Sequence, residues 1–547
     1  MSLPATPPAG AAPTPPAEQP IPWFGLAAVL LGTFISTLNG RLSAFGLGDI
    51  RGGVHAGFDD GAWITTAQTV AQMLILPIAV WLGAVFGARR VLIQAALAYA
   101  VISFLEPFSP NLATLLGLQF MGGLASGFFI PLTLSFILRG TPPRFWAYGI
   151  ALYALNLELS LNISASLEGW YVDNLSWRWI FWQNVPLALG MFACFRWGSR
   201  PEPPNPAPPM PDRFGLVTSG AGLALIYAAL DQGNRLDWLN SGLIVGLLVA
   251  GVILVAAFVV HERRSHQAFI NLKVAVSPPM PRLLAGVAFL RLTILSTAYL
   301  IPQFLGAVRG FRALEVGQTM IWIAAPQLIV CPLAAVMLRR MDPRLVASMG
   351  FILICIACLM VAYGLTPVWG SDQFLLSQLL QAVGQSLALS GVVFFGILHM
   401  KPEDALTFGA ALQTSRLMGG QIGSAFIATF VRVRSQIASN HIGLHVQVGD
   451  SQVLHRLHTY AEITGQAVDP ATASERAVAV LAGVVRSAAA TQGVIDGFVA
   501  IGVLTAVALM VVVVAQKPAP IGPASHTPLF GPRPEPTPTP DVGAQPS

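Results

Sequence analysis

The chain has 547 residues, of which 54% are hydrophobic and only 10% are charged, and its mean hydropathy is +0.66. Soluble domains carry about 25% charged residues, so this composition excludes ordinary soluble domains and predicts a protein that crosses a membrane many times. The formal net charge of +5 does not indicate a nucleic-acid partner, because the Lys and Arg residues lie in short clusters between apolar runs.

The first section of the chain predicts a tail followed by a bundle of six membrane-spanning helices. Residues 1–22 are Pro-rich and lack a basic n-region, so we expect a disordered cytoplasmic tail and not a secretory signal peptide. Residues 23–200 form the expected bundle, because they contain six apolar runs near the ~20 residues needed to cross a bilayer. These runs are residues 23–45, 62–86, 91–108, 112–138, 145–167 and 177–195.

The middle section, residues 201–281, begins with a Pro-rich stretch and contains two further apolar runs. The runs are residues 214–230 and 241–260. We interpret this section as a linker with two additional transmembrane helices.

The last section, residues 282–515, predicts a second six-helix bundle. Its apolar runs are residues 283–305, 317–338, 345–365, 374–397, 406–431 and 493–515. An outer loop, residues 433–491, separates the final two runs, and residues 516–547 form a second Pro-rich cytoplasmic tail. The predicted fold is an all-α polytopic membrane protein of about 14 spans, with two bundles that rock around a central site.

Basic residues alternate between successive loops, and this alternation predicts the orientation. Arg89 and Arg90 follow the second run, and Arg339 follows the tenth, whereas other short loops carry acidic residues such as Asp59 and Asp173. Short cytoplasmic loops are enriched in Lys and Arg. We therefore expect a multi-pass protein with both termini in the cytoplasm.

Four ionisable residues lie deep inside the predicted spans. A charged side chain there costs at least ~2.5 kcal/mol, so such a residue is by default a functional candidate. They are Arg41, Glu158, Arg291 and Arg416. Glu158 is the only carboxylate of this set, and we predict that it takes up and releases the coupling proton. The alternative is a static ion pair of Glu158 with Arg41 or another arginine, which would only fix helix packing.

Polar residues follow one side of the fifth run and predict a helix that faces the protein interior. Asn156 and Ser160 are four residues apart, with Glu158 and Asn162 on the adjoining face. Together with Asn39, these polar residues and the three arginines form the predicted substrate or charge-pair site. Three arginines against one carboxylate favour anionic or weakly acidic amphipathic substrates.

Enzymatic, cofactor and metal sites are not predicted. The pairs His441/His445 and His455/His458 are weak metal signals without further ligands. The glycine pairs within the spans are not followed by the GKT or GKS of a phosphate-binding loop, so they indicate close helix packing. Uphill transport must then use an ion gradient.

Three strings carry a resemblance to a known family: WRWIFWQNVP at residues 177–186, DQGNRLDW at 231–238 and SRLMGGQIG at 415–423. They resemble the fourteen-span drug:proton antiporter family of the major facilitator superfamily, the EmrB/QacA group of multidrug exporters. The resemblance covers nearly all of the chain except the tails. It implies an exporter of the bacterial inner membrane whose outer face binds a periplasmic adaptor protein and, through it, an outer-membrane channel.

The antiporter and gating motifs of that family are degenerate in this chain. The gating loop keeps Gly87, Arg89 and Arg90 but lacks the usual acidic residue, and Asn39 stands where the family commonly has an aspartate. The antiporter motif of the fifth run retains only its last glycine, Gly169.

The expected function is export of small amphipathic compounds, drug-like or of organic-anion type, by proton-coupled alternating access. An uncoupled facilitator, an importer, and a transporter-derived sensor or scaffold without transport remain the alternatives.

Overall fold

The structure is a computed structural model that describes residues 23–140, 145–198, 212–264, 280–398, 405–447, 449–464 and 470–514. Within these ranges every regular element is helical and no β-strand is present, which confirms the all-α prediction. The two predicted tails, 1–22 and 516–547, lie outside the described residues.

The N-terminal half contains helices that correspond to the six predicted runs, with two differences. The run at 112–138 is divided into two helices at Gly127 and Phe128, and the run at 177–195 is divided at Gln183. The elements are α1 (Trp23–Phe45), α2 (Leu47–Gly53), α3 (Phe58–Gly61), α4 (Trp63–Phe86), α5 (Ala88–Leu105), η1 (Glu106–Phe108), α6 (Leu112–Ser126), α7 (Phe129–Gly140), α8 (Trp146–Asn174), α9 (Trp179–Trp182) and α10 (Asn184–Gly198).

Local sequence signals explain where several helices begin. Asn111 caps α6, because its side chain accepts a hydrogen bond from the backbone N–H of Thr114 at 2.9 Å. Asp212 caps α11 (Arg213–Gly233) in the same way, with Gly215 N at 3.0 Å. The partner helix of α11 is α12 (Gly242–Arg264), and the turn between them contains η3 (Trp238–Asn240).

The C-terminal half contains the remaining helices. They are α14 (Met280–Thr293), the π-helical η4 (Ser296–Leu300), α15 (Ile301–Ala307), α16 (Ala313–Arg340), α17 (Pro343–Gly364), η5 (Asp372–Phe374), α18 (Leu375–Leu398), α19 (Ala405–Gly443), α20 (Ser451–Thr464) and α21 (Pro470–Val514).

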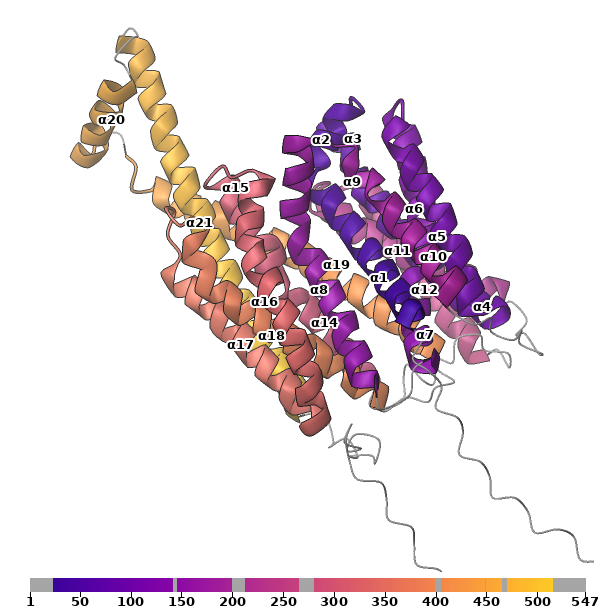
Figure 1. Ribbon diagram of the computed structural model, residues 1–547. Coiled ribbons are helices and arrows are strands. Elements are labelled where there is room, and N and C mark those ends of the chain that lie inside the picture. The colour runs from indigo at the N-terminus through magenta and orange to yellow at the C-terminus, as the bar shows by residue number, and fades with distance from the viewer. Residues whose placement is uncertain are drawn as a thin grey trace, which may run out of the picture.

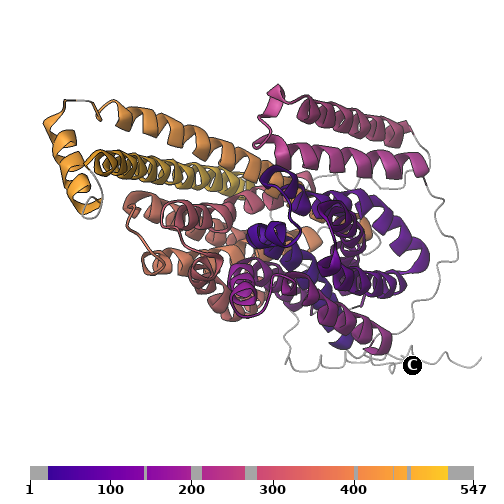
Figure 2. The ribbon, with the colours of Figure 1, turned by 90° about the horizontal axis from the view of Figure 1, so that it is seen from above.

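The two halves lie side by side (Figure 1), and helices from both of them pack together along two lines. On one line α8 packs against α16 and α18, and on the other α19 packs against α4 and α7. The α11–α12 hairpin lies along one side of the molecule, where α11 contacts both α4 and α19 (Figure 2). The section boundaries at 23–200, 201–281 and 282–515 stay predictions.

Twelve helices of the described residues are long and apolar enough to cross a membrane. The predicted spans at 177–195 and 406–431 are helical, as α9 with α10 and as part of α19, but they are not among the twelve. The count of fourteen spans therefore stays a prediction.

The predicted outer loop is largely a continuation of two long helices. α19 has 39 residues and α21 has 45 residues, and both extend past the neighbouring helices to an arm that carries α20 at its tip (Figure 1). At the base of the arm, Arg434 Nε pairs with Asp496 Oδ2 at 2.5 Å. We define α20 and the parts of α19 and α21 beyond this ion pair as the outer arm.

Candidate functional site

Helix α8 lies at the boundary between the two halves and carries the predicted polar residues inward. It packs against α1 on the N-terminal side and against α16 and α18 on the C-terminal side. Glu158 is fully buried, and so are Ser160 and Ser164, while Asn162 is 2% exposed. The prediction that this polar face points into the protein is confirmed.

Glu158 carries a buried carboxyl group. Neither of its carboxylate oxygens has a hydrogen-bond partner among the described residues. Arg291 and Arg416 nevertheless lie close enough to interact with it electrostatically. The structure therefore shows a carboxyl group that faces nearby positive charge without the contact of a static ion pair.

The arginines near Glu158 connect the two halves. Arg416 of α19 donates through Nη1 to Thr37 Oγ1 of α1 at 3.4 Å and through Nε to Gln413 at 2.9 Å. Arg41 of α1 donates through Nη2 to the carbonyl oxygen of Ala298 in η4 at 2.9 Å. Arg291 of α14 has an Nε without a hydrogen-bond partner in the described part of the chain.

An amide pair forms a further polar connection. Asn162 Nδ2 donates to the carbonyl oxygen of Glu158 at 2.9 Å and to Gln327 Oε1 of α16 at 3.2 Å. Gln327 is itself fully buried. Sequence reasoning missed Gln327 and Thr37, because a single uncharged polar residue in an apolar run does not differ from one that only supports packing.

Three of the predicted site residues make contacts within the N-terminal half. Asn39 accepts a hydrogen bond from Asn184 of α10 at 2.8 Å, and Asn156 donates to the carbonyl oxygen of Leu30. Ser160 donates to the carbonyl oxygen of Asn156 at 2.6 Å. The structure thus brings Glu158, Asn162 and the three arginines to the boundary between the halves, and it places Asn39, Asn156 and Ser160 in helix packing behind it.

The residues of the predicted gating loop separate in the structure. Gly87 ends α4 with φ of 84°, a conformation that favours glycine, and its N–H donates to Gly83 O at 3.1 Å. Arg89 donates to the carbonyl oxygens of Phe195 and Arg196 at 3.2 Å each, so it connects the start of α5 to the end of α10. Arg90 is exposed.

Glycines allow the halves to approach closely on both sides of the Glu158 region. A Cβ atom at Gly317 of α16 would lie 2.5 Å from Ser166 N of α8, and one at Gly169 of α8 would lie 2.5 Å from Leu314 N. Toward the opposite end of the molecule, a Cβ atom at Gly409 of α19 would lie 2.7 Å from Pro131 O. Close backbone contact thus occurs both where α8 meets α16 and where α19 meets α7.

Glu158 is not the only buried carboxyl group among the described residues. Glu106 and Glu168 are each 1% exposed, and Asp231 accepts a hydrogen bond from Thr66 of α4. Glu168 and Asp231 directly follow the predicted runs at 145–167 and 214–230, because those runs end before the helices do. α8, for example, continues to Asn174.

Comparisons with known proteins agree with this arrangement. The Major Facilitator Superfamily profile matches residues 29–428. The chain is similar to the multidrug export protein EmrB of Haemophilus influenzae, with 27% identity over 74% of this chain and 79% of that protein. It is also similar to the fatty acid resistance protein FarB of Neisseria gonorrhoeae, with 22% identity over 91% of this chain and 96% of FarB.

A solved structure shows the same fold at low sequence identity. It is the crystal structure of the human organic anion transporter MFSD10 (TETRAN), which matches with a TM-score of 0.54 and 14% identity over 90% of this chain and 100% of that one.

Proposed function

The chain belongs to the Major Facilitator Superfamily, a family of membrane transporters and not of enzymes, and from this membership we propose that it exports small amphipathic compounds across the bacterial inner membrane by alternating access. Glu158 is the proposed proton-carrying group. The substrates are drug-like molecules, in keeping with the similarity to multidrug export proteins of the EmrB type.

The observation that carries this proposal is the position of Glu158. It is fully buried in α8, at the boundary between the two halves, and its carboxylate oxygens have no hydrogen-bond partner among the described residues. Two arginines interact with it electrostatically. A carboxyl group used only for packing would be expected to have its hydrogen-bonding capacity satisfied. An unsatisfied one is free to bind a proton or a substrate cation.

Alternating access would require the contacts across the boundary to break in turn. The bonds from Asn162 to Gln327, from Arg416 to Thr37 and from Arg41 to Ala298 O each join one half to the other. Each is a single hydrogen bond, typically worth about 0.5–3 kcal/mol net, so the set can be exchanged without unfolding either half.

The charge of the substrate determines whether proton uptake at Glu158 can drive export by antiport. A cationic substrate and a proton compete for Glu158, and competition for one site between two access states gives antiport and hence export. An anionic substrate does not compete in this way, because protonation of Glu158 leaves the arginine charges free to attract it.

The arginine excess favours a second candidate, an uncoupled facilitator of organic anions. Among the described residues, Arg291 and Arg416 act electrostatically on Glu158, and Arg41 in turn interacts with Arg291. The membrane potential itself drives an anion outward by about 2.3 kcal/mol per 100 mV, so such a substrate needs no proton exchange to leave the cell. The similarity to a fatty acid resistance protein is consistent with this substrate class.

Transport by purified protein in liposomes separates the two candidates. With the membrane potential clamped at zero, an acidic lumen should drive accumulation of tetraphenylphosphonium by the wild type. Glu158→Gln should lower this accumulation at least about tenfold, equivalent to about 1.4 kcal/mol, and leave downhill exchange intact. The matched control is Glu168→Gln, which removes a carboxyl group of equal burial on the same helix.

Accumulation that is unchanged in Glu158→Gln would contradict proton coupling at this residue. Movement of a fatty-acid probe with the membrane potential, but not with the pH gradient, would instead identify the facilitator.

The outer arm is the proposed contact for a periplasmic adaptor protein and, through it, an outer-membrane channel. Support comes from its projection beyond the neighbouring helices and from the family resemblance (Figure 1).

A further inference from the structure

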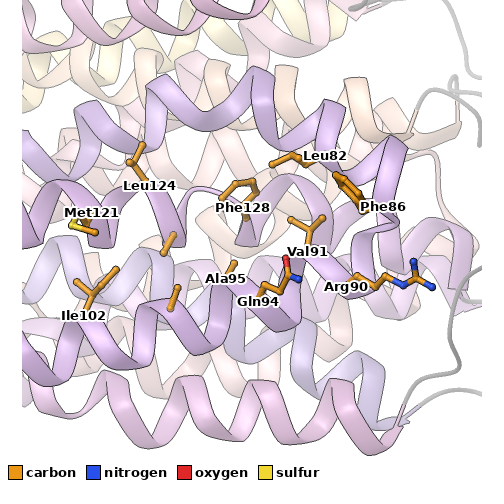
Figure 3. Close-up of a pocket in the computed structure, with 12 residues that line it drawn as sticks. Leu82, Phe86, Arg90, Val91, Gln94, Ala95, Ile102, Met121, Leu124 and Phe128 are labelled. Atoms are coloured by element: carbon orange, nitrogen blue, oxygen red, sulfur yellow. The ribbon is translucent and has the colours of Figure 1, made fainter. Parts of the chain in front are cut away.

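A groove of about 530 Å³ runs along the surface of the N-terminal half between α4, α5 and the α6–α7 segment (Figure 3). Small residues form its floor, namely Ala95 and Ala98 of α5 and Ala125 of α6, and bulky residues such as Phe86 and Met121 form its walls. The groove therefore exists because α5 presents alanines where its neighbours present large apolar side chains.

The groove faces the surroundings of the protein and not its interior. Phe86 is 51% exposed and Met121 is 53% exposed, and both lie on candidate membrane spans. The lining of α5 extends from Arg90 to Ile102, which corresponds to about 18 Å at ~1.5 Å per residue. One leaflet supplies about half of a ~30 Å hydrocarbon core, so the groove is about as long as one leaflet is deep.

Among the described lining residues, polar side chains occur at one end of the groove only. Arg90 and Gln94 lie four residues apart on α5, both are exposed, and Figure 3 shows them at the same end as Phe86. Within the described ranges neither side chain takes part in a hydrogen bond or an ion pair. A side-chain amide on a lipid-facing surface is costly without a polar partner. Gln94 thus indicates that a ligand with its own polar group occupies this depth.

We propose that this groove binds one anionic phospholipid of the cytoplasmic leaflet. Arg90 pairs with the headgroup phosphate, Gln94 donates to an ester carbonyl, and one acyl chain lies along the alanine floor. None of the described residues that line the groove is acidic and could hold the ammonium group of a zwitterionic lipid, and basic residues at the cytoplasmic surface attract anionic headgroups. The inference uses the predicted orientation of the α4–α5 turn and does not depend on the proposed transport function.

Native mass spectrometry of the purified full-length protein tests this site. Phosphatidylglycerol and phosphatidylcholine with identical acyl chains are titrated separately. The wild type should bind phosphatidylglycerol about fivefold more tightly, as expected for one basic residue near a charged headgroup. Arg90→Gln should abolish this preference.

A second variant tests the acyl-chain part of the site. Ala98→Leu should prevent binding of either lipid at the groove, because the added carbons occupy its floor. Ala98 is exposed, so the larger side chain does not enter the core and the variant should fold. The matched control is Val101→Leu, since Val101 is 53% exposed on the same helix and does not line the groove.

Equal binding of the two lipids by the wild type would overturn the proposal. A preference for phosphatidylglycerol in Arg90→Gln equal to that of the wild type would also overturn it. Lipid binding by Ala98→Leu equal to that of the wild type would do the same. Displacement of bound phosphatidylglycerol by tetraphenylphosphonium would identify the groove as a substrate entrance and would overturn it as well.

Discussion

The candidate functional residues lie between the two halves, where some buried charged groups lack hydrogen-bond partners among the described residues. Arg416 is 5% exposed and hydrogen-bonded, whereas Arg291 and Glu158 both have buried polar atoms without partners among the described residues. A charge held without direct contacts is available to a ligand at a lower cost than one that must first break an ion pair. Arg291 is therefore the best candidate to hold an anionic substrate group.

Replacing Arg291 should alter substrate selection. We expect Arg291→Gln to lower the flux of a fatty-acid probe in proteoliposomes at least about tenfold, because about 1.4 kcal/mol is a modest value for a desolvated charge contact. The flux of a lipophilic cation should not fall. Arg340→Gln is the control, since Arg340 is an exposed arginine at the end of α16. Equal losses for both probes would show that Arg291 supports structure only.

The sequence predicted the charged residues of this region better than the uncharged ones. Glu158 and the arginines stand out because each interrupts an apolar run at a large energetic cost. Gln327 and Thr37 interrupt their runs at little cost, and only the packing of α8 on α16 and of α19 near α1 assigns them to the site. Glu168 was missed because α8 extends beyond its apolar run.

At the level of elements, the contact between α8 and α16 holds the two halves together near one end of the molecule. Gly169 faces Leu314, and Gly317 faces Ser166, so the two backbones touch without intervening side chains. The only glycine retained from the degenerate antiporter motif, Gly169, thus has a packing role that requires no conserved motif around it.

A methyl group at this contact should destabilise the protein. We expect Gly317→Ala to lower the Tm by several degrees, because overpacking typically costs about 1–3 kcal/mol. Thermal unfolding of the detergent-solubilised protein measures the effect. Gly306→Ala in α15 is the matched control, since a Cβ atom there has no neighbour within 4 Å. A Tm equal to that of the wild type would mean that α8 and α16 separate easily.

The positions of the helices could be predicted from apolar runs, but their irregularities could not. The π-helical turn η4 lies inside the predicted run at 283–305. There the hydroxyls of Ser296 and Thr297 donate to the carbonyl oxygens of Thr293 and Ile294 at 2.8 and 2.9 Å, and such bonds compete with regular helix geometry. The hydropathy pattern of the sequence shows neither this competition nor the division of the run at 112–138 into α6 and α7.

For the whole molecule, the number of membrane crossings needs a test. The uncertain crossings are α10 and α19, which are not among the twelve candidate spans. α19 is 39 residues long and carries Arg416, Arg432 and Arg434, so its charge content and its length both differ from a typical span.

Reporter fusions should place the two ends of α10 and of α19 on opposite sides of the membrane. Alkaline phosphatase fused after Leu175 or after Leu444 should be active in the periplasm, whereas fusions after Gly198 and after Leu398 should be inactive. This pattern gives fourteen crossings with the N-terminus in the cytoplasm. Activity on both sides of either helix would remove that helix from the count.

Proton release on substrate binding provides the decisive test of Glu158. Tetraphenylphosphonium is added to the purified protein in weakly buffered detergent solution, and the pH change is recorded with an indicator dye. The wild type should release protons as the cation displaces them from Glu158, whereas Glu158→Gln should bind without release and Glu168→Gln should behave like the wild type. Proton release by Glu158→Gln equal to that of the wild type would contradict the assignment of the coupling proton to this residue.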